Sequence, residues 1–297
     1  MSIKVSVVVL TYNHQDFIAK AIESILSQKV NFKIEIIIAD DSSTDKTSAI
    51  IEQLSLEKPE IITVNSSKEN KGVRKNILGI VEKVKGEYLA ILDGDDYWEN
   101  DLKLQKQVDF LESNKEYNGI FHDAKIMHID TSDKVLFHNK YLYSQNYQFQ
   151  EEIFPSDLIS RTVILPSSSA LLRLGKLTNN DWELITDNYS FLWKLCCLII
   201  RGSKFYFVNE PWSVYRNHYK GISKNNNDKF RLSHVRFLKN LLGDNYYRNH
   251  KYRVYQAIAN EYKLLLDSKS ENKKGVFRKY VWSEICKIWY YRKTIAR

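Results

Sequence analysis

Short apolar runs alternate with helical apolar repeats in the N-terminal third of the chain. Residues 4–10, 34–39, 61–64 and 88–92 are rich in apolar side chains, and each run has the length of a buried strand. In the intervening segments apolar residues recur every three or four positions, which predicts helices. Strands that alternate with helices indicate an α/β protein with a parallel sheet.

The alternation weakens in the middle of the chain, where a mixed sheet is expected. The predicted elements are a helix over about 100–113, a strand at 120–124, hairpins to 147, a helix over 187–200 and strands at 205–208 and 212–215. From Asp228 onward the pattern is helical. We therefore predict an α/β domain over residues 1–225 and a C-terminal helical extension over residues 226–297.

The predicted parallel strands end in polar turns. Open α/β sheets bind ligands beyond the carboxyl ends of their strands. The turns are Thr11-Tyr12-Asn13, Asp40-Asp41-Ser42-Ser43, Asn70-Lys71-Gly72 and Asp93-Gly94-Asp95-Asp96. Polar turns follow strands in any soluble protein, but three aspartates within four residues repel one another unless a cation offsets their charge.

The last of these turns has the composition of a magnesium or manganese site. Carboxylates such as Asp93, Asp95 and Asp96 are hard oxygen ligands, and Mg²⁺ or Mn²⁺ leaves coordination positions for substrate phosphates. A calcium-binding EF-hand loop needs a glutamate at position twelve, which counted from Asp93 is Leu104. The turn therefore favours a divalent ion that assists the departure of a phosphorylated leaving group.

Cysteine content and hydropathy favour the reducing cytoplasm. The cysteines Cys196, Cys197 and Cys286 cannot form a disulfide framework, and no histidine lies near them at zinc-like spacing. We expect no secretory signal, because the first strand begins without a longer apolar segment and cleavage site. The longest apolar run, residues 195–200, is far shorter than the roughly 20 residues of a membrane-spanning helix.

The net charge of +8 is unevenly distributed along the chain. Residues 229–297 contain 17 Lys and Arg against 5 Asp and Glu, which leaves 27 against 31 for residues 1–228. An acidic body is a poor surface for nucleic acid, so a nucleic-acid-binding module is not favoured. A basic tail rich in aromatic residues suits anionic headgroups or an anionic acceptor.

In motif order and spacing the chain resembles family 2 glycosyltransferases with the GT-A fold. The matching segments are residues 7–13, 40–45, 70–73 and 86–88, the acidic turn Asp93-Gly94-Asp95-Asp96 followed by Tyr97 and Trp98, and residues 103–107. They cover the first 110 residues, and weaker similarity continues to about residue 223. The resemblance implies a Rossmann-like nucleotide-sugar-binding half over residues 1–98 and an acceptor-binding half over residues 99–225.

The resemblance also implies residue roles around a nucleotide diphosphate. Thr11, Tyr12 and Asn13 would line the base pocket, and Asp41 would accept a hydrogen bond from the uracil N3–H. Asp93 and Asp95 would also bind the nucleotide, and Asp95, Asp96 and His218 would bind the metal. Trp98 and Arg216 would contact the diphosphate or the acceptor. Arg74 would approach the pyrophosphate, or else is a solvated charge on a helix.

The predicted catalytic segment departs from the family pattern. The family places a Glu-Asp pair at a helix start, whereas this chain has Asp187 and Asn188. An asparagine cannot accept a proton at neutral pH. Either Asp187 acts as the base, or Asp181 does, or catalysis is weak; we predict Asp187, for which the alternative role is a helix cap.

Two further segments are candidates for the site. Arg216 and His218 occupy alternate positions of a predicted strand, so their side chains should lie on the same face. Ser167-Ser168-Ser169 is a candidate lining of the acceptor pocket or a plain polar turn.

The C-terminal extension combines an apolar repeat with basic and aromatic residues. The apolar positions are Phe277, Val281, Ile285 and Ile288, with Trp282, Trp289, Tyr290 and Tyr291 as possible interfacial anchors. This composition suits a helix on a membrane surface. The alternative is a helix packed on the catalytic domain, whose lysine stems lie along apolar surface.

The combined prediction is an inverting transferase that uses a UDP-sugar and Mn²⁺ or Mg²⁺. Its acceptor would be a hydroxyl of a glycan or lipid-linked oligosaccharide in surface polysaccharide biosynthesis, at the inner face of the cell membrane. Two alternatives are a degenerate nucleotide- or glycan-binding domain, which Asn188 permits, and a sugar-1-phosphate nucleotidyltransferase. The latter resembles a pattern with a glycine-rich loop after the first strand, where this chain has Thr11-Tyr12-Asn13-His14.

Overall fold

The computed structural model forms two compact units. It describes residues 2–66, 80, 83–130, 132, 135–141, 150–160, 165–175, 177–185, 190–219, 228–268 and 273–295. Unit 1 comprises Met1–Ile153, Ile164–Leu177 and Ser203–Lys220, and unit 2 comprises Phe154–Val163, Thr178–Gly202 and Gly221–Arg297. Each unit is described by itself below.

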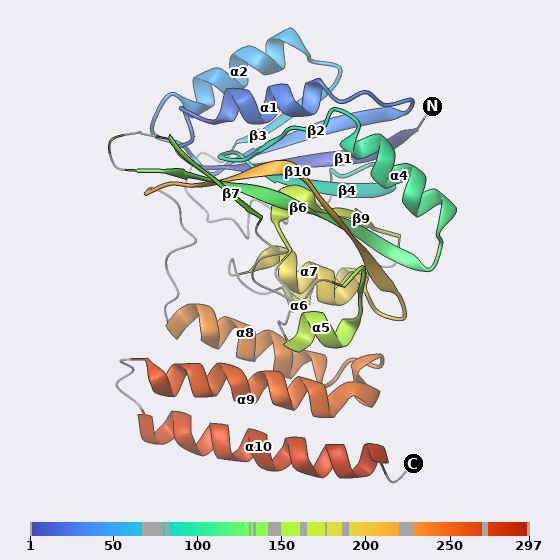
Figure 1. Cartoon of the computed structure of the whole chain (residues 1–297), viewed down its shortest axis with the longest axis vertical. Helices are drawn as coiled ribbons and strands as arrows, with labels where there is room; N and C mark the ends of the chain where they lie inside the picture. The colour runs from blue at the N-terminus through green and yellow to red at the C-terminus, as the bar shows by residue number, and fades with distance from the viewer. Residues whose placement is uncertain are drawn as a thin grey trace. The chain divides into compact units, whose positions relative to one another are not determined.

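The first half of the unit 1 sheet is parallel, as the alternating pattern predicts. Its strands are β1 (Ile3–Thr11), β2 (Lys33–Asp40), β3 (Ile62–Ser66) and β4 (Tyr88–Asp93), in the order β3-β2-β1-β4 (Figure 1). In the centre, Val7 of β1 pairs with Ile36 on one side and Ala90 on the other. These strands are apolar over consecutive residues because both faces of a parallel sheet are covered.

The second half makes this a mixed sheet of ten strands among the described residues. Its strands are β5 (Tyr97–Trp98), β6 (Tyr117–Ile129), β7 (Val135–Tyr141), β8 (Glu152–Ile153), β9 (Leu171–Arg173) and β10 (Lys204–Asn217). β9 runs antiparallel to β4 and β6, and β10 runs parallel to β6. The predicted α/β class with a mixed second half is therefore confirmed.

The strands predicted at 205–208 and 212–215 are one long strand, β10. Its register against β6 shifts between Val208 and Ser213, on either side of Pro211. Proline has no amide hydrogen to donate, so it interrupts regular pairing without ending the strand.

The helices of unit 1 are α1 (Ile18–Leu26), α2 (Thr47–Glu57) and α4 (Lys103–Ser113), with the 3₁₀ turn η1 (Ser167–Ser169). α1 and α2 lie on the same face of the sheet in Figure 1. The buried side of α1 consists of Ile18, Ala21, Ile22 and Ile25, which recur at helical spacing. The helix predicted between the apolar runs 61–64 and 88–92 falls largely outside the described residues.

Unit 2 is helical in the described part of the chain. Its elements are α5 (Pro155–Ser160), α6 (Asn179–Leu184), α7 (Phe191–Ile199), α8 (Asp228–Leu241), η3 (Tyr247–His250), α9 (Lys251–Asp267) and α10 (Lys273–Ile295). α9 lies between α8 and α10 (Figure 1). Unit 2 thus joins the predicted C-terminal extension to three helices that precede it in sequence. None of the helices in the described ranges has the length and apolarity to cross a bilayer.

Candidate active site

The acidic turn after β4 lies beside the end of β1. Leu10 of β1 pairs with Asp93, and the Gly94 amide donates a hydrogen bond to the Leu10 carbonyl at 2.8 Å. A Cβ atom on Gly94 would lie 2.8 Å from Thr11 Oγ1 and 2.9 Å from His14 Nδ1. The turn therefore needs glycine at this position, because the two strand ends approach too closely for any side chain.

Two carboxyl groups of the turn are held in surroundings that disfavour their charge. Burial, together with the charge of Asp95, raises the pKa of Asp93 to about 6, although Ser167 Oγ donates a hydrogen bond to it. Burial and the neighbouring carboxylates also raise the pKa of Asp96 well above its ordinary value. Its Oδ1 accepts a hydrogen bond from the Arg216 amide at 2.9 Å. Burial and mutual repulsion therefore disfavour ionisation of both carboxyl groups, and a bound cation would favour it.

Asp95 is the point at which three distant segments meet. Its Oδ2 lies 3.0 Å from His218 Nε2 and 3.7 Å from His14 Nε2. Its backbone carbonyl accepts a hydrogen bond from Arg216 Nη1 at 2.7 Å. Burial acts to raise the pKa of Asp95, but the hydrogen bond from His218 and the nearby histidines outweigh it and leave the pKa lowered.

Arg216 and His218 lie on the same side of the β10 end, as their spacing predicts. Both reach Asp95. The Arg216 guanidinium also lies 4.5 Å from the ring centroid of Tyr97 and 5.1 Å from that of Phe17. These ring contacts fix the position of the cation beside the turn.

The ends of β1 and β2 also come together. The Asp41 amide donates to the Thr11 carbonyl at 3.1 Å. Asn13 has a left-handed backbone (φ 56°), and its Oδ1 accepts a hydrogen bond from the Thr44 amide at 2.8 Å. Tyr12 is at the surface. The residues predicted to line a base pocket therefore share one edge of the sheet with the acidic turn.

Comparison with known proteins identifies the family. The sequence profile described as glycosyl transferase family 2 matches residues 6–171, more than half of the chain. The chain belongs to glycosyl transferase family 2. The resemblance to family 2 glycosyltransferases that the motifs predicted is therefore confirmed.

Relatives and solved structures agree with family 2. An uncharacterized protein of Mycobacterium tuberculosis is 29% identical over 217 residues, which are 73% of this chain and 60% of that protein. The chain thus spans about three fifths of that relative. The Escherichia coli UDP-Glc:alpha-D-GlcNAc-diphosphoundecaprenol beta-1,3-glucosyltransferase WfaP is 42% identical over 111 residues, covering 37% of this chain and 42% of WfaP. The crystal structure of residues 1–349 of S. aureus TarS with UDP-GlcNAc aligns with a TM-score of 0.67 at 15% identity, over 95% of this chain and 79% of that fragment, which confirms the GT-A fold.

Trp98, assigned by resemblance to the diphosphate or acceptor, lies in the core of this family 2 protein. It is almost fully buried, and its indole N–H donates to the Ser168 carbonyl at 2.7 Å. Lys103 Nζ lies 4.2 Å from its ring centroid. Direct contact of Trp98 with a substrate stays a prediction that this burial does not support. Ser167, a candidate lining of the acceptor pocket, donates a hydrogen bond to Asp93, and its role at the acceptor stays a prediction.

Asp187, Asn188 and Arg74 all lie outside the described residues. The alternative base, Asp181, is the partner of the N-cap residue Thr178 in the capping box of α6. It also forms an ion pair with Arg201 at 2.6 Å. Its carboxylate is thus already engaged within unit 2.

Sequence reasoning missed His14 and Phe17 as parts of this site. His14 Nδ1 lies 3.2 Å from Thr11 Oγ1, and its other ring nitrogen faces Asp95. Burial lowers the pKa of His14, against the attraction of Asp95. The available signal was a titratable residue directly after the first polar turn, three positions beyond Thr11.

The donor set fits a divalent cation that completes its coordination with substrate. In the described segments no group of three or more His, Cys, Asp or Glu side chains is arranged to hold a metal. However, Asp95 and Asp96 are consecutive in the turn, and His218 Nε2 lies 3.0 Å from Asp95 Oδ2. Carboxylate oxygen and imidazole nitrogen both suit Mn²⁺.

Proposed function

We propose that this protein transfers a sugar from a UDP-sugar to a hydroxyl of a lipid-linked oligosaccharide or growing surface polysaccharide, with inversion at the anomeric carbon. The observation that carries the proposal is the convergence of Arg216 and His218 on the acidic turn. An arginine and a histidine beside a carboxylate turn at the strand ends suit a nucleotide diphosphate and its metal.

The donor is proposed from the strand ends and from related proteins. TarS has been solved with UDP-GlcNAc, the name of WfaP specifies UDP-Glc, and a Pyrobaculum calidifontis mannosyltransferase (TM-score 0.51) binds GDP-Man and Mn²⁺. We propose that Thr11, Tyr12 and Asn13 line the base pocket. Asp41 then selects uracil, because a carboxylate accepts the hydrogen bond of the imide N–H.

Around the diphosphate, Asp95, Asp96 and His218 would hold Mn²⁺ or Mg²⁺. When bound, the ion would offset the charge that develops on the departing UDP. Arg216 is already fixed by the Asp95 carbonyl and the rings of Tyr97 and Phe17, so it can stabilise the same charge with little rearrangement. Arg74 is proposed as a further cation at the pyrophosphate.

A single displacement also needs a base for the acceptor hydroxyl. We assign this role to Asp187, since Asn188 cannot accept a proton at neutral pH and Asp181 is engaged by Arg201. We propose that the acceptor is used at the cytoplasmic face of the cell membrane, because a lipid-linked glycan is confined to a membrane and the name of WfaP specifies a diphosphoundecaprenol-linked acceptor.

The test is UDP release from a panel of UDP-sugars by the full-length protein with Mn²⁺. Release that increases with a lipid-linked acceptor supports transfer, whereas release without acceptor dependence indicates only donor hydrolysis. Nucleoside diphosphate binding without any turnover would favour the degenerate binding domain. If calorimetry also detects no cation-dependent binding of UDP, the proposed function is wrong.

A further inference from the structure

Helix α10 has apolar side chains on two opposite faces. One face packs on α9: the ring of Tyr290 stacks on Tyr255 at 5.5 Å, and Tyr291 meets Tyr252 at 5.3 Å between centroids. Ser283, on the same side, is buried. This face already has its partner within the chain.

The outer face of α10, opposite Ser283, is also apolar. We define it by Phe277, Val281, Trp282, Ile285, Ile288 and Trp289. At 100° per residue these six positions fall in one arc of the helix, and each side chain is between 38% and 65% exposed. A surface helix ordinarily turns polar residues to solvent, and a continuous apolar stripe of this size marks an interaction surface.

The charge around this face is strongly positive. α10 contains seven Lys and Arg and one acidic residue, Glu284, which pairs with Lys287 at 2.5 Å. By helical position, Arg278 falls within the apolar arc, and Lys274 and Arg292 align with its centre near the two ends of the helix. Lys293 Nζ lies 3.7 Å from the ring centroid of Trp289. The helix therefore presents aromatic and aliphatic groups together with cations.

We propose that the outer face of α10 binds the surface of a lipid bilayer that contains anionic headgroups. Trp282, Ile285 and Trp289 enter the boundary between headgroups and acyl chains, and the cations contact lipid phosphates. The helix lies in the plane of the surface, since it lacks the apolarity to span a bilayer. The inference rests on the proposed function only to explain why the protein would bind a membrane.

Charge decides between a membrane and a second copy of the chain. Pairing two outer faces would bring two helices of net charge +6 together, which electrostatic repulsion opposes. An anionic membrane instead attracts each basic residue, and attraction to the surface adds to burial of the apolar groups.

The test is co-sedimentation of the full-length protein with two kinds of vesicle, phosphatidylcholine alone and phosphatidylcholine with phosphatidylglycerol. We expect at least about tenfold stronger binding to the anionic vesicles, and weaker binding at high salt. The triple variant Trp282→Ser, Ile285→Ser, Trp289→Ser should bind at least about tenfold more weakly. The control Leu56→Ser changes an exposed leucine of α2 in unit 1 and should bind like the wild type.

A second variant keeps the apolar face and removes charge. Lys274→Gln, Arg278→Gln, Arg292→Gln should lose the preference for anionic vesicles while its melting temperature stays that of the wild type. Equal binding of the wild type to both vesicle types, or binding by the serine variant as strong as that of the wild type, would overturn the proposal. So would a dimer in sedimentation that the serine variant dissociates while neither vesicle is bound. Hydrolysis of a soluble UDP-sugar does not need vesicles, so failure here is distinguishable from failure of the proposed function.

Discussion

At the scale of single residues, Asp95 organises the candidate site. Its side chain meets His218 and its carbonyl meets Arg216, which are 123 and 121 positions away in sequence. The neighbouring carboxyls of Asp93 and Asp96 have raised pKa values, whereas that of Asp95 is lowered. The pKa values of the three aspartates in one turn thus shift in different directions, because different groups surround each carboxyl.

Replacing Asp95 and Asp96 by asparagine should abolish metal-assisted binding of UDP. The substitution keeps the shape of each side chain but removes the negative charge that a divalent ion needs. We expect at least about a hundredfold loss of turnover, equivalent to about 2.7 kcal/mol. Titration calorimetry with UDP and Mn²⁺ measures the binding. Asp101→Asn, at an exposed ion pair with Lys29, is the matched control and should bind normally.

Gly94→Ala should destabilise unit 1 and reduce turnover. The new methyl group would meet Thr11 and His14 below 3.0 Å, and relieving such a contact typically costs about 1–3 kcal/mol. Gly175→Ala is the matched control, because its Cβ would meet nothing within 4 Å. Calorimetric melting compares the two, and equal melting temperatures would show that the turn tolerates a side chain.

Asp187→Asn tests the proposed base. Turnover should fall at least about a hundredfold, since the proton of the acceptor hydroxyl then has no carboxylate to receive it. UDP binding should persist, which distinguishes this variant from those of the acidic turn. Unchanged turnover would reject the assignment.

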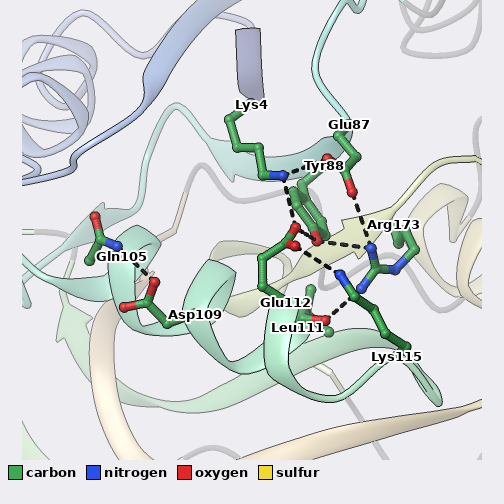
Figure 2. A network of polar contacts seen from close by, with 9 residues as sticks. All are labelled: Lys4, Glu87, Tyr88, Gln105, Asp109, Leu111, Glu112, Lys115 and Arg173. Atoms are coloured by element: carbon green, nitrogen blue, oxygen red, sulfur yellow. Dashed lines mark hydrogen bonds and ion pairs between the residues drawn. The ribbon is translucent and has the colours of Figure 1, made fainter. Parts of the chain in front are cut away.

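At the scale of elements, a polar network joins β1, β4, β9 and α4 (Figure 2). Lys4 contacts Glu87 at 2.6 Å and Glu112 at 2.8 Å, and the Tyr88 hydroxyl donates to Glu112 at 2.5 Å. Arg173 contacts Glu87 and donates to the Tyr88 hydroxyl at 2.9 Å. The network lies at the starts of β1 and β4, whereas the acidic turn follows the end of β4. It therefore fixes the sheet without occupying the candidate site.

This network predicts a loss of stability in acid. Hydrogen bonds from Lys115, Lys4 and Tyr88 lower the pKa of Glu112 to about 2, from an ordinary value of 4.5. A pKa that is lowered in the folded state stabilises the folded protein at pH values above 4.5, and that stabilisation disappears as the pH falls towards 2. Because Glu112 is partly exposed, the effect should be on the order of 1 kcal/mol.

Glu112→Gln is the variant that measures this effect. Its free energy of unfolding should lie below that of the wild type at pH 6, and the two should converge near pH 2. Urea titrations across this range provide the comparison. Gln105→Ala on the same helix removes two exposed hydrogen bonds, one to Asp109 and one from the Asn31 amide, but no charge, and should leave the pH dependence unchanged. A constant difference between Glu112→Gln and the wild type would contradict the assignment.

At the scale of the whole molecule, α7 depends on the C-terminal helices of its own unit. The ammonium of its buried Lys194 donates to Ser233 of α8 at 2.8 Å, and the Tyr247 hydroxyl donates to the Cys197 carbonyl at 2.6 Å. His234 of α8 lies 2.9 Å from Glu261 of α9 and 2.8 Å from Ser190. Removing these helices would break hydrogen bonds of buried polar groups, which is costly.

A chain ending at residue 225 should therefore be poorly folded in its remaining part of unit 2. We expect amides of α7 to lose protection from hydrogen exchange, while those of β1 and β4 keep it. A chain ending at residue 272 retains α8 and α9 and is the matched comparison. Full protection of α7 in the shorter chain would instead support an independent domain over residues 1–225.

Much of the fold and part of the site follow from local pattern. The parallel strands, the helical C-terminal part and the acidic turn were predictable because each depends on neighbouring residues and on the period of apolar positions. His14 and the burial of Trp98 were not, because both result from contacts between segments. The same is true of β10, whose continuity across Pro211 is set by pairing with β6.

The sequence by itself determined the family, the order of the parallel strands along the chain and the carboxylates at the strand end. These depend on short-range spacing, which a linear pattern records. Only the tertiary structure decided which atoms of Arg216 and His218 reach Asp95, that His14 joins them, and that α10 keeps a second apolar face uncovered by α9. Such contacts arise from sheet register and helix packing between distant segments, and no local spacing specifies them.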